Sequence, residues 1–212
     1  MGNFPDSLTE RFHRFRFRHF DQNRDRYAEL AAFGQNPDVM IVSCCDSRCD
    51  PETIFSAMPG ELFVVRNVAN LIPPFETGGK FHGVSAALEF AALNLRVKHI
   101  VVLAHSGCGG IKACLQEGSA RQTEALFISR WMSMLDECRM SVLSSHKGAS
   151  PSVLVREMEM AGVKVSLKNL RSFPFIQDLE NRSKISLSGA YFDIATGDLS
   201  VLNQQNGEFH IL

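Results

Sequence analysis

Three short apolar runs rich in β-branched residues are separated by longer segments, and this alternation limits the possible folds more than any other feature. The runs are DVMIVSC at 38–44, LFVVRNV at 62–68 and HIVVLAH at 99–105. Between the last two, VSAALEFAALNL at 84–95 has the spacing of apolar residues that a helix requires. Strands that alternate with helices are typical of a parallel sheet covered by helices. We therefore predict an α/β fold.

The second half of the chain continues this pattern and then changes. Helices are predicted from Ile111 and over 121–143 and 151–172. The end is strand-like, with KISLSGAYFDI at 184–194, a Thr-Gly-Asp turn at 196–198 and then LSVLN. The closing hairpin indicates an antiparallel strand. The predicted fold is thus a mostly parallel central β-sheet with flanking helices and one antiparallel edge strand.

The beginning of the chain predicts a helical arm. Residues 6 to about 33 have helical periodicity, with a break near 21–23. Their large apolar side chains lie on more than one side of the helix: Leu8, Phe12, Phe15, Phe17 and Phe20. Such an arm must bury these side chains against its own body or against a partner. We predict an N-terminal helical arm over 1–33 and a single α/β domain over 34–212.

The charge balance and the apolar segments argue against several classes of function. Lys plus Arg number 22 and Asp plus Glu 23 in 212 residues, so the net charge of −1 gives no basic field for nucleic acid. No segment reaches the ~18 consecutive apolar residues of a membrane span, and the first residues lack the apolar core of a signal peptide. We expect a cytoplasmic protein that binds neither nucleic acid nor membrane. There, the six cysteines are expected to be thiols or metal ligands rather than disulfides.

Cysteine and histidine side chains follow two of the predicted strands, at the point where each strand ends. CCDSRC at 44–49 follows the first run, and HSGCGG at 105–110 contains His105 and Cys108. Open α/β sheets bind ligands at the carboxyl ends of their strands, so the two segments are expected to be neighbours. Thiolate and imidazole suit zinc, and one cysteine from 44–49 would complete a Cys₂His set. Three protein ligands leave a fourth position open, which is typical of a catalytic zinc.

Strand geometry separates the cysteines of the first segment. Successive side chains of a strand point to opposite faces, so Cys44 and Cys45 do not both face one metal while the strand stays regular. Cys44 has the parity of Asp46 and Arg48, which makes it the better partner for them. Asp46 fits the role of an acid/base or an occasional ligand, held by paired hydrogen bonds from Arg48. The alternative is an ordinary surface ion pair of small energetic value.

Beyond this chemistry, CCDSR (44–48), FVVRNVANLIPP (63–74) and HSGCGG (105–110) closely resemble the plant-like branch of the β-class carbonic anhydrases, over most of the chain. The resemblance implies one Zn²⁺ per chain, with Cys44, His105 and Cys108 as ligands. It also implies a catalytic dyad and a set of substrate-binding positions. These are Asp46 and Arg48 for the dyad, Gln35 in the active site, Phe63, Val68 and Phe90 as the apolar lining for CO₂, and the backbone N–H of Gly109 for bicarbonate.

Two positions depart from patterns within that family. Phe90 stands where plant-like members usually have Tyr, so a hydroxyl role is lost there. Ile41 stands where another branch has a Trp that forms a non-catalytic bicarbonate pocket, so that pocket is not expected. The resemblance further implies a homodimer, or a tetramer built as a dimer of dimers, with active sites at the subunit interface. In such a dimer the arm embraces the partner, which would account for phenylalanines on several of its sides.

The resemblance implies reversible hydration of CO₂ to bicarbonate and a proton by a zinc-bound hydroxide. The segment 34–212 would then be the zinc-binding catalytic domain. A rival hypothesis is a non-catalytic structural zinc or thiol redox module, in which Cys45 and Cys49 supply further thiolates. That hypothesis leaves Asp46 and Arg48 without a role. A third keeps the fold and the zinc but hydrolyses carbonyl sulfide or carbon disulfide.

Overall fold

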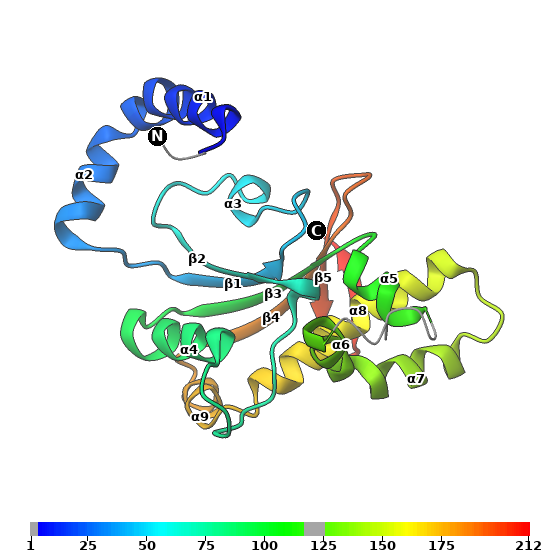
Figure 1. The fold of residues 1–212 in the computed structure, drawn as a ribbon. Helices are drawn as coiled ribbons and strands as arrows, with labels where there is room; N and C mark the ends of the chain where they lie inside the picture. Colours follow the sequence, from blue (N-terminus) through cyan, green and yellow to red (C-terminus); the bar gives the residue numbers. More distant parts are fainter. Residues whose placement is uncertain (1–3, 117–125) are drawn as a thin grey trace.

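A computed structural model describes residues 4–116 and 126–212, and these contain a six-stranded sheet with the order β2-β1-β3-β4-β5-β6 (Figure 1). The strands are β1 (Val39–Cys44), β2 (Leu62–Asn67), β3 (His99–His105), β4 (Ser186–Phe192), β5 (Leu199–Asn203) and β6 (Glu208–Ile211). β1 to β4 are parallel, whereas β5 and β6 are antiparallel to their neighbours. The mostly parallel α/β fold is confirmed. The sequence predicted one antiparallel strand, and the second follows an Asn206-Gly207 turn, a common hairpin signal.

The helices agree with the predicted segments in the long elements and differ in the short ones. In chain order they are α1 (Asp6–Arg14), η1 (Phe15–Phe20), α2 (Arg24–Phe33), α3 (Pro51–Ile54), η2 (Val68–Asn70), α4 (Gly83–Glu89), η3 (Phe90–Leu95), α5 (Gly109–Leu115), α6 (Leu126–Met132), η4 (Ser133–Leu135), α7 (Asp136–Ser145), α8 (Pro151–Leu170) and α9 (Pro174–Asn181). Of the helix predicted over 121–143, residues 121–125 lie outside the described part. The short α3 and α9 were not predicted. In the described ranges, no helix combines the length and apolar character needed to cross a membrane.

The main core lies between the sheet and the helices α4, α8 and α9, which are drawn below the sheet in Figure 1. Met40, Val42 and Val102 point into this layer and are fully buried. The opposite face carries a smaller cluster that includes Ile54 of α3. A Cβ at Gly189 of β4 would lie 2.5 Å from a methyl carbon of Val163 on α8, so glycine is what lets this helix approach the sheet. This close approach packs α8 against β3 and β4.

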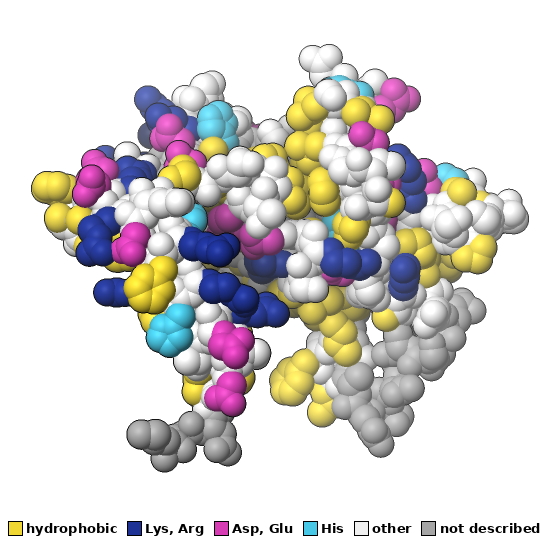
Figure 2. Space-filling model, turned by 90° about the horizontal axis from the view of Figure 1, so that it is seen from above, with side chains coloured by type: hydrophobic (Ala, Val, Ile, Leu, Met, Phe, Trp, Pro, Cys, Tyr) yellow, Lys and Arg dark blue, Asp and Glu magenta, His cyan; other side chains and the backbone are white. Residues whose placement is uncertain are grey.

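The arm formed by α1, η1 and α2 projects from the body in Figure 1. The predicted break near residues 21–23 is confirmed, because α2 starts anew after Asn23. None of the residues in α1, η1 and α2 is buried, and Phe12 and Phe17 are 55% and 73% exposed. Hydrophobic side chains lie next to Lys and Arg along the projecting arm in Figure 2. Of the two alternatives for burying the phenylalanines, packing against the arm's own body is therefore not what the structure has.

Candidate metal centre

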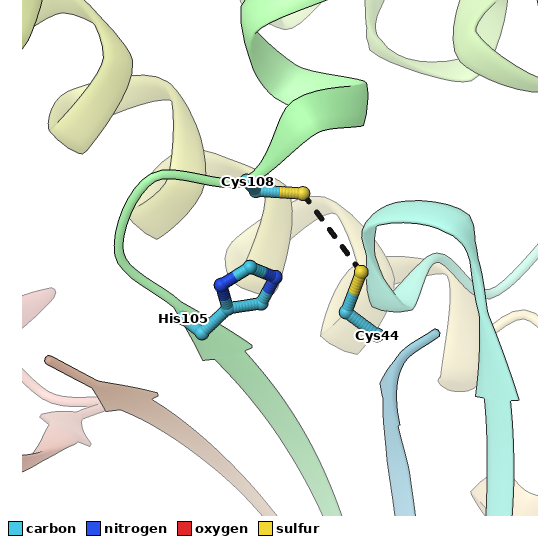
Figure 3. A group of neighbouring side chains, drawn as sticks. All are labelled: Cys44, His105 and Cys108. Atoms are coloured by element: carbon cyan, nitrogen blue, oxygen red, sulfur yellow. Dashed lines mark hydrogen bonds between the residues drawn. The ribbon is translucent and has the colours of Figure 1, made fainter. Parts of the chain in front are cut away.

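Cys44, His105 and Cys108 converge at one edge of the sheet (Figure 3). Cys44 ends β1 and His105 ends β3, and these strands are parallel neighbours, so both side chains reach the same edge. Cys108 caps the start of α5, after a turn in which Gly107 has a φ of +72°. The three side chains are buried, and their ligand atoms all lie within 4.8 Å of one another. The structure thus brings together the three side chains that were predicted as zinc ligands.

The geometry of this cluster fits a metal ion with soft ligands. The Sγ atoms of Cys44 and Cys108 are 3.9 Å apart, close to the ~3.8 Å between two thiolates on a tetrahedral zinc with Zn–S bonds of ~2.3 Å. Nδ1 of His105 is 3.0 Å from the carbonyl oxygen of Ser106, which only accepts hydrogen bonds, so Nδ1 carries the proton and Nε2 keeps a lone pair. Nε2 is buried without a hydrogen-bond partner among the described residues, and its ring points toward the sulfurs in Figure 3. A metal ion would provide the missing partner.

The protein itself favours a thiolate at Cys44. Hydrogen bonds from the thiols of Cys108 and Cys49 lower the pKa of Cys44 far below its ordinary value, against the opposing effect of burial. The same contacts raise the pKa of Cys49 and of Cys108. A bound dication would favour a second thiolate at Cys108, because ligand cysteines lose their protons to the metal.

Asp46 and Arg48 form a two-pronged ion pair beside the cluster. Oδ1 of Asp46 accepts from Nε of Arg48 at 2.9 Å, and Oδ2 accepts from Nη2 at 2.7 Å. These hydrogen bonds from Arg48 lower the pKa of Asp46 to about 2, so the carboxylate is ionised at neutral pH. Oδ2 also lies 3.9 Å from Nε2 of His105. The pair therefore places a carboxylate oxygen next to the point where a metal would bind.

The turn that carries this pair lies outside β1. The strand ends at Cys44, and the backbone N–H of Cys45 donates to the carbonyl oxygen of Asn67 at 2.9 Å before the chain turns. The alternation of side chains along a strand therefore does not apply to Asp46 and Arg48, and it does not explain why they lie on the same side as Cys44. The cluster nevertheless contains Cys44, while the side chain of Cys45 is exposed.

Arg66 and Cys49 fix the shape of this turn, and the sequence did not predict either role. Arg66 of β2 donates to the carbonyl oxygens of Cys44 at 2.9 Å and Asp46 at 2.7 Å. It also donates to the carboxylate of Asp50 at 3.0 Å. The buried Sγ of Cys49 lies 3.3 Å from the carbonyl oxygen of Asp46, without joining the group of three ligand atoms. Contacts to backbone carbonyls depend on the folded path of the turn, which residue types alone do not reveal.

A buried carboxylate on α8 lies behind the cluster and was also missed. Glu159 is 2% exposed, and its Oε1 accepts from the backbone N–H of Cys108 at 2.7 Å. Its Oε2 accepts from the hydroxyl of Tyr191 at 3.0 Å. Burial raises the pKa of Glu159, and these two hydrogen bonds oppose that shift. A sequence signal did exist, because Glu159 shares the buried face of α8 with Met158 and Gly162, where an acid needs a polar partner.

Two of the predicted substrate-binding residues lie close to the cluster. Val68 directly follows β2, whose last residue, Asn67, pairs with Cys44. Gly109 directly follows Cys108 and is exposed. Both positions are therefore compatible with contacts to a small molecule bound at the cluster.

The other three, Gln35, Phe63 and Phe90, lie toward the opposite end of the strands. Phe63 pairs with Met40 at the start of β1, and the step from Met40 to Cys44 measures ~13 Å at ~3.3 Å per residue. The rings of Phe63 and Phe90 have centroids 5.9 Å apart. Gln35 is exposed and precedes β1. Within one chain, these three side chains do not line the cluster.

Comparisons with known proteins agree with this chemistry. The family model described as carbonic anhydrase matches residues 39–199. The chain is 30% identical over 201 residues to a carbonic anhydrase of Synechococcus elongatus, which covers 95% of this chain and 72% of that protein. It is 34% identical over 193 residues to beta carbonic anhydrase 3 of Arabidopsis thaliana, which covers 91% of this chain and 74% of that protein.

Solved structures extend the similarity to the whole fold. The β-carbonic anhydrase CcaA matches with a TM-score of 0.92 and 29% identity, over 100% of this chain and 93% of that one. One of two tetrameric β-carbonic anhydrases from the ascomycete Sordaria macrospora matches with a TM-score of 0.83 and 27% identity, over 93% of this chain and 96% of that one. From the extent of these matches, the chain belongs to the β-carbonic anhydrase family and is a carbonic anhydrase.

Proposed function

We propose that this enzyme binds one zinc ion through Cys44, His105 and Cys108 and catalyses the reversible hydration of CO₂ to bicarbonate and a proton. The Asp46–Arg48 pair carries this proposal, because it holds an ionised carboxylate 3.9 Å from the unpartnered nitrogen of His105. A structural zinc module needs a fourth ligand, whereas the group found in the described residues has three members. Asp46 is the nearest carboxylate, but Arg48 engages both of its oxygens, which suits an oriented hydrogen-bond acceptor better than a ligand.

Each residue around the cluster has a separate role in the hydration of CO₂. Zinc held by two thiolates and one imidazole would lower the pKa of a water molecule toward neutrality, though less than three imidazoles would, because thiolates donate more negative charge. Asp46, an acceptor-only carboxylate, accepts a hydrogen bond from the attacking water and directs its lone pair toward CO₂. Arg48 holds both carboxylate oxygens in place. Gly109 offers its backbone N–H to bicarbonate.

We propose that a second copy of the chain completes the apolar pocket for CO₂. Gln35, Phe63 and Phe90 lie toward the far end of the strands from their own cluster, and Phe90 is 44% exposed. Phe12 and Phe17 of the arm are exposed as well. A homodimer in which each arm lies on the partner would cover these side chains and bring the second pocket half to each cluster. A tetramer would repeat this dimer.

We place the enzyme in the cytoplasm. The thiols of Cys44, Cys45, Cys49 and Cys108 form no disulfide. A reducing compartment would preserve Cys44 and Cys108 as zinc ligands.

The zinc-loaded protein is expected to hydrate CO₂ at a rate that rises from about pH 6 to about pH 9, because thiolate ligands leave the water at the metal less acidic than imidazoles do. Asp46, with a pKa of about 2, does not titrate in this range. Stopped-flow measurements with a pH indicator test both points. Zinc at one per chain without hydration would favour the structural module, and a flat pH profile would contradict the ligand set.

A mixture of two inactive variants is expected to regain activity if each site draws on two chains. Asp46→Asn disables the dyad and Phe90→Glu disables the pocket. In a mixed dimer, one site contains both substitutions and the other site contains neither. About half of the dimers in an equal mixture are mixed, so about a quarter of all sites are active. Stopped-flow rates after subunit exchange measure this recovery.

The matched control for this experiment mixes Asp46→Asn with Arg48→Ala. Both substitutions lie on the same half of the site, so no mixed dimer contains an intact site. Recovery in neither mixture, with dimers verified by light scattering, would mean that each chain supplies its own pocket.

A further inference from the structure

Glu159 has no place in the chemistry above, yet it contacts the backbone of a proposed zinc ligand. We propose that Glu159 is a positioning residue, whose carboxylate fixes the backbone of Cys108 and thereby the direction in which its Sγ points. This inference rests on the proposed zinc site. On this proposal, α8 sets the distance between His105 and Cys108, two zinc ligands that lie on the same turn. The helix is far from this turn in the sequence.

Hydrogen bonds hold the turn from His105 to Cys108 both near its start and at its end. Near its start, Oγ of Ser106 accepts a hydrogen bond from the backbone N–H of Ile194 at 2.9 Å. At its end, the backbone N–H of Cys108 donates to Oε1 of Glu159 at 2.7 Å. The first anchor ties the turn to the segment after β4, and the second ties it to α8. The second anchor is thus the one that acts directly on the ligand residue.

Glu159 is itself held in place on its other side. The hydroxyl of Tyr191 on β4 donates to Oε2 at 3.0 Å, and both side chains are 2% exposed. The guanidinium carbon of Arg156 lies 5.6 Å from the centre of the Tyr191 ring. A buried carboxylate with one donor on each oxygen is a fixed bridge, because moving it would leave a buried donor unpaired. Residues that hydrogen-bond to a metal ligand without contacting the metal, here called outer partners, commonly orient that ligand.

Positioning by this bridge differs from a simple effect of negative charge. Glutamine has the length of glutamate and keeps an oxygen for the N–H of Cys108, while its amide can donate to the hydroxyl oxygen of Tyr191. Aspartate keeps the charge but is one methylene shorter, so it withdraws the oxygen from Cys108. If the position of the oxygen matters, Glu159→Gln should retain the zinc affinity of the wild type and Glu159→Asp should lose it. If the negative charge matters, Glu159→Asp should retain the affinity and Glu159→Gln should lose it.

The test is the zinc affinity of the full chain, measured by competition with a chromophoric chelator. Glu159→Ala and Glu159→Asp are expected to bind zinc 10–100-fold more weakly than the wild type, on the order of losses seen for outer partners of metal ligands. Glu159→Gln is expected to stay within about threefold of the wild type. Glu157→Ala is the matched control, because Glu157 lies on the same helix with a side chain that is 41% exposed. Its affinity should not change.

Cobalt substitution gives a second readout that a general loss of stability would not move. The visible bands of Co²⁺ report the geometry of its thiolate ligands, and they should shift in Glu159→Asp but not in Glu159→Gln. Wild-type affinity and spectrum in Glu159→Asp, or equal losses in Glu159→Gln and Glu159→Asp, would overturn the proposal. If Glu159→Ala does not fold, the comparison of Glu159→Gln with Glu159→Asp still tests the proposal. Failure of the wild type to bind zinc would instead overturn the proposed function.

Discussion

Replacing Cys44 with serine is expected to leave the protein without zinc and to slow CO₂ hydration by roughly 1,000-fold or more, since metal catalysis supplies several kcal/mol of transition-state stabilisation. Serine keeps the shape of the side chain but does not ionise near neutral pH, so two of the three ligands remain. The cluster is buried and its sulfurs are 3.9 Å apart, which leaves little room for a substitute ligand. Zinc per chain after gel filtration, together with stopped-flow rates, measures both effects.

Cys45→Ser and Cys49→Ser are the matched controls, and both should keep zinc at one per chain. The side chain of Cys45 is exposed and lies outside the cluster. Cys49 is the sharper control, because its buried thiol helps to lower the pKa of Cys44. A serine hydroxyl at position 49 can still donate a hydrogen bond. Loss of zinc from either control would assign the ligand role to that cysteine.

The parallel part of the fold was predictable because its signals are local. The runs that became β1, β2 and β3 are apolar and β-branched, as is typical of parallel strands, although β2 at the sheet edge is only half-buried. α8 was predictable from its length, and its start is marked by Ser150, which caps the helix before Pro151. β6 was missed although an Asn-Gly turn precedes it and its residues alternate between polar and apolar, because a strand of four mostly exposed residues gives only a weak signal. Tertiary pairing with β5 supplies what this strand lacks.

The zinc ligands were predictable because they sit at strand ends, where the topology of a parallel sheet joins distant segments. The residues that support them were not. Glu159 lies 51 positions from the Cys108 backbone that it contacts, and only the packing of α8 against β4 brings the two together. Phe63 and Phe90 show the opposite case. A resemblance assigns them to the active site, but the register of β2 on β1 places them at the other end of their own sheet.

Asp46→Asn is expected to slow CO₂ hydration on the order of 100-fold or more while zinc stays at one per chain, because a hydrogen-bond acceptor that orients the attacking water contributes about that factor. Asparagine keeps the size of the side chain but replaces one acceptor oxygen with an amide donor. It also breaks the two-pronged pair with Arg48, in which both carboxylate oxygens are engaged. Stopped-flow rates and zinc content of the same preparation separate this loss from a loss of metal.

The pH dependence of that loss identifies the role of Asp46. Its pKa of about 2 lies below the ordinary value of 3.8, so the charged pair with Arg48 is complete above pH 4 and is lost only as the pH falls toward 2. Wild-type Asp46 is therefore ionised throughout the assay range, and the variant should be slower by the same factor at every pH from about 6 to about 9. Asp178→Asn, which removes an exposed carboxylate paired with Arg182, should change nothing. A loss confined to one end of the pH range would mean that Asp46 titrates there, and the carboxylate would then be a proton carrier rather than a fixed acceptor.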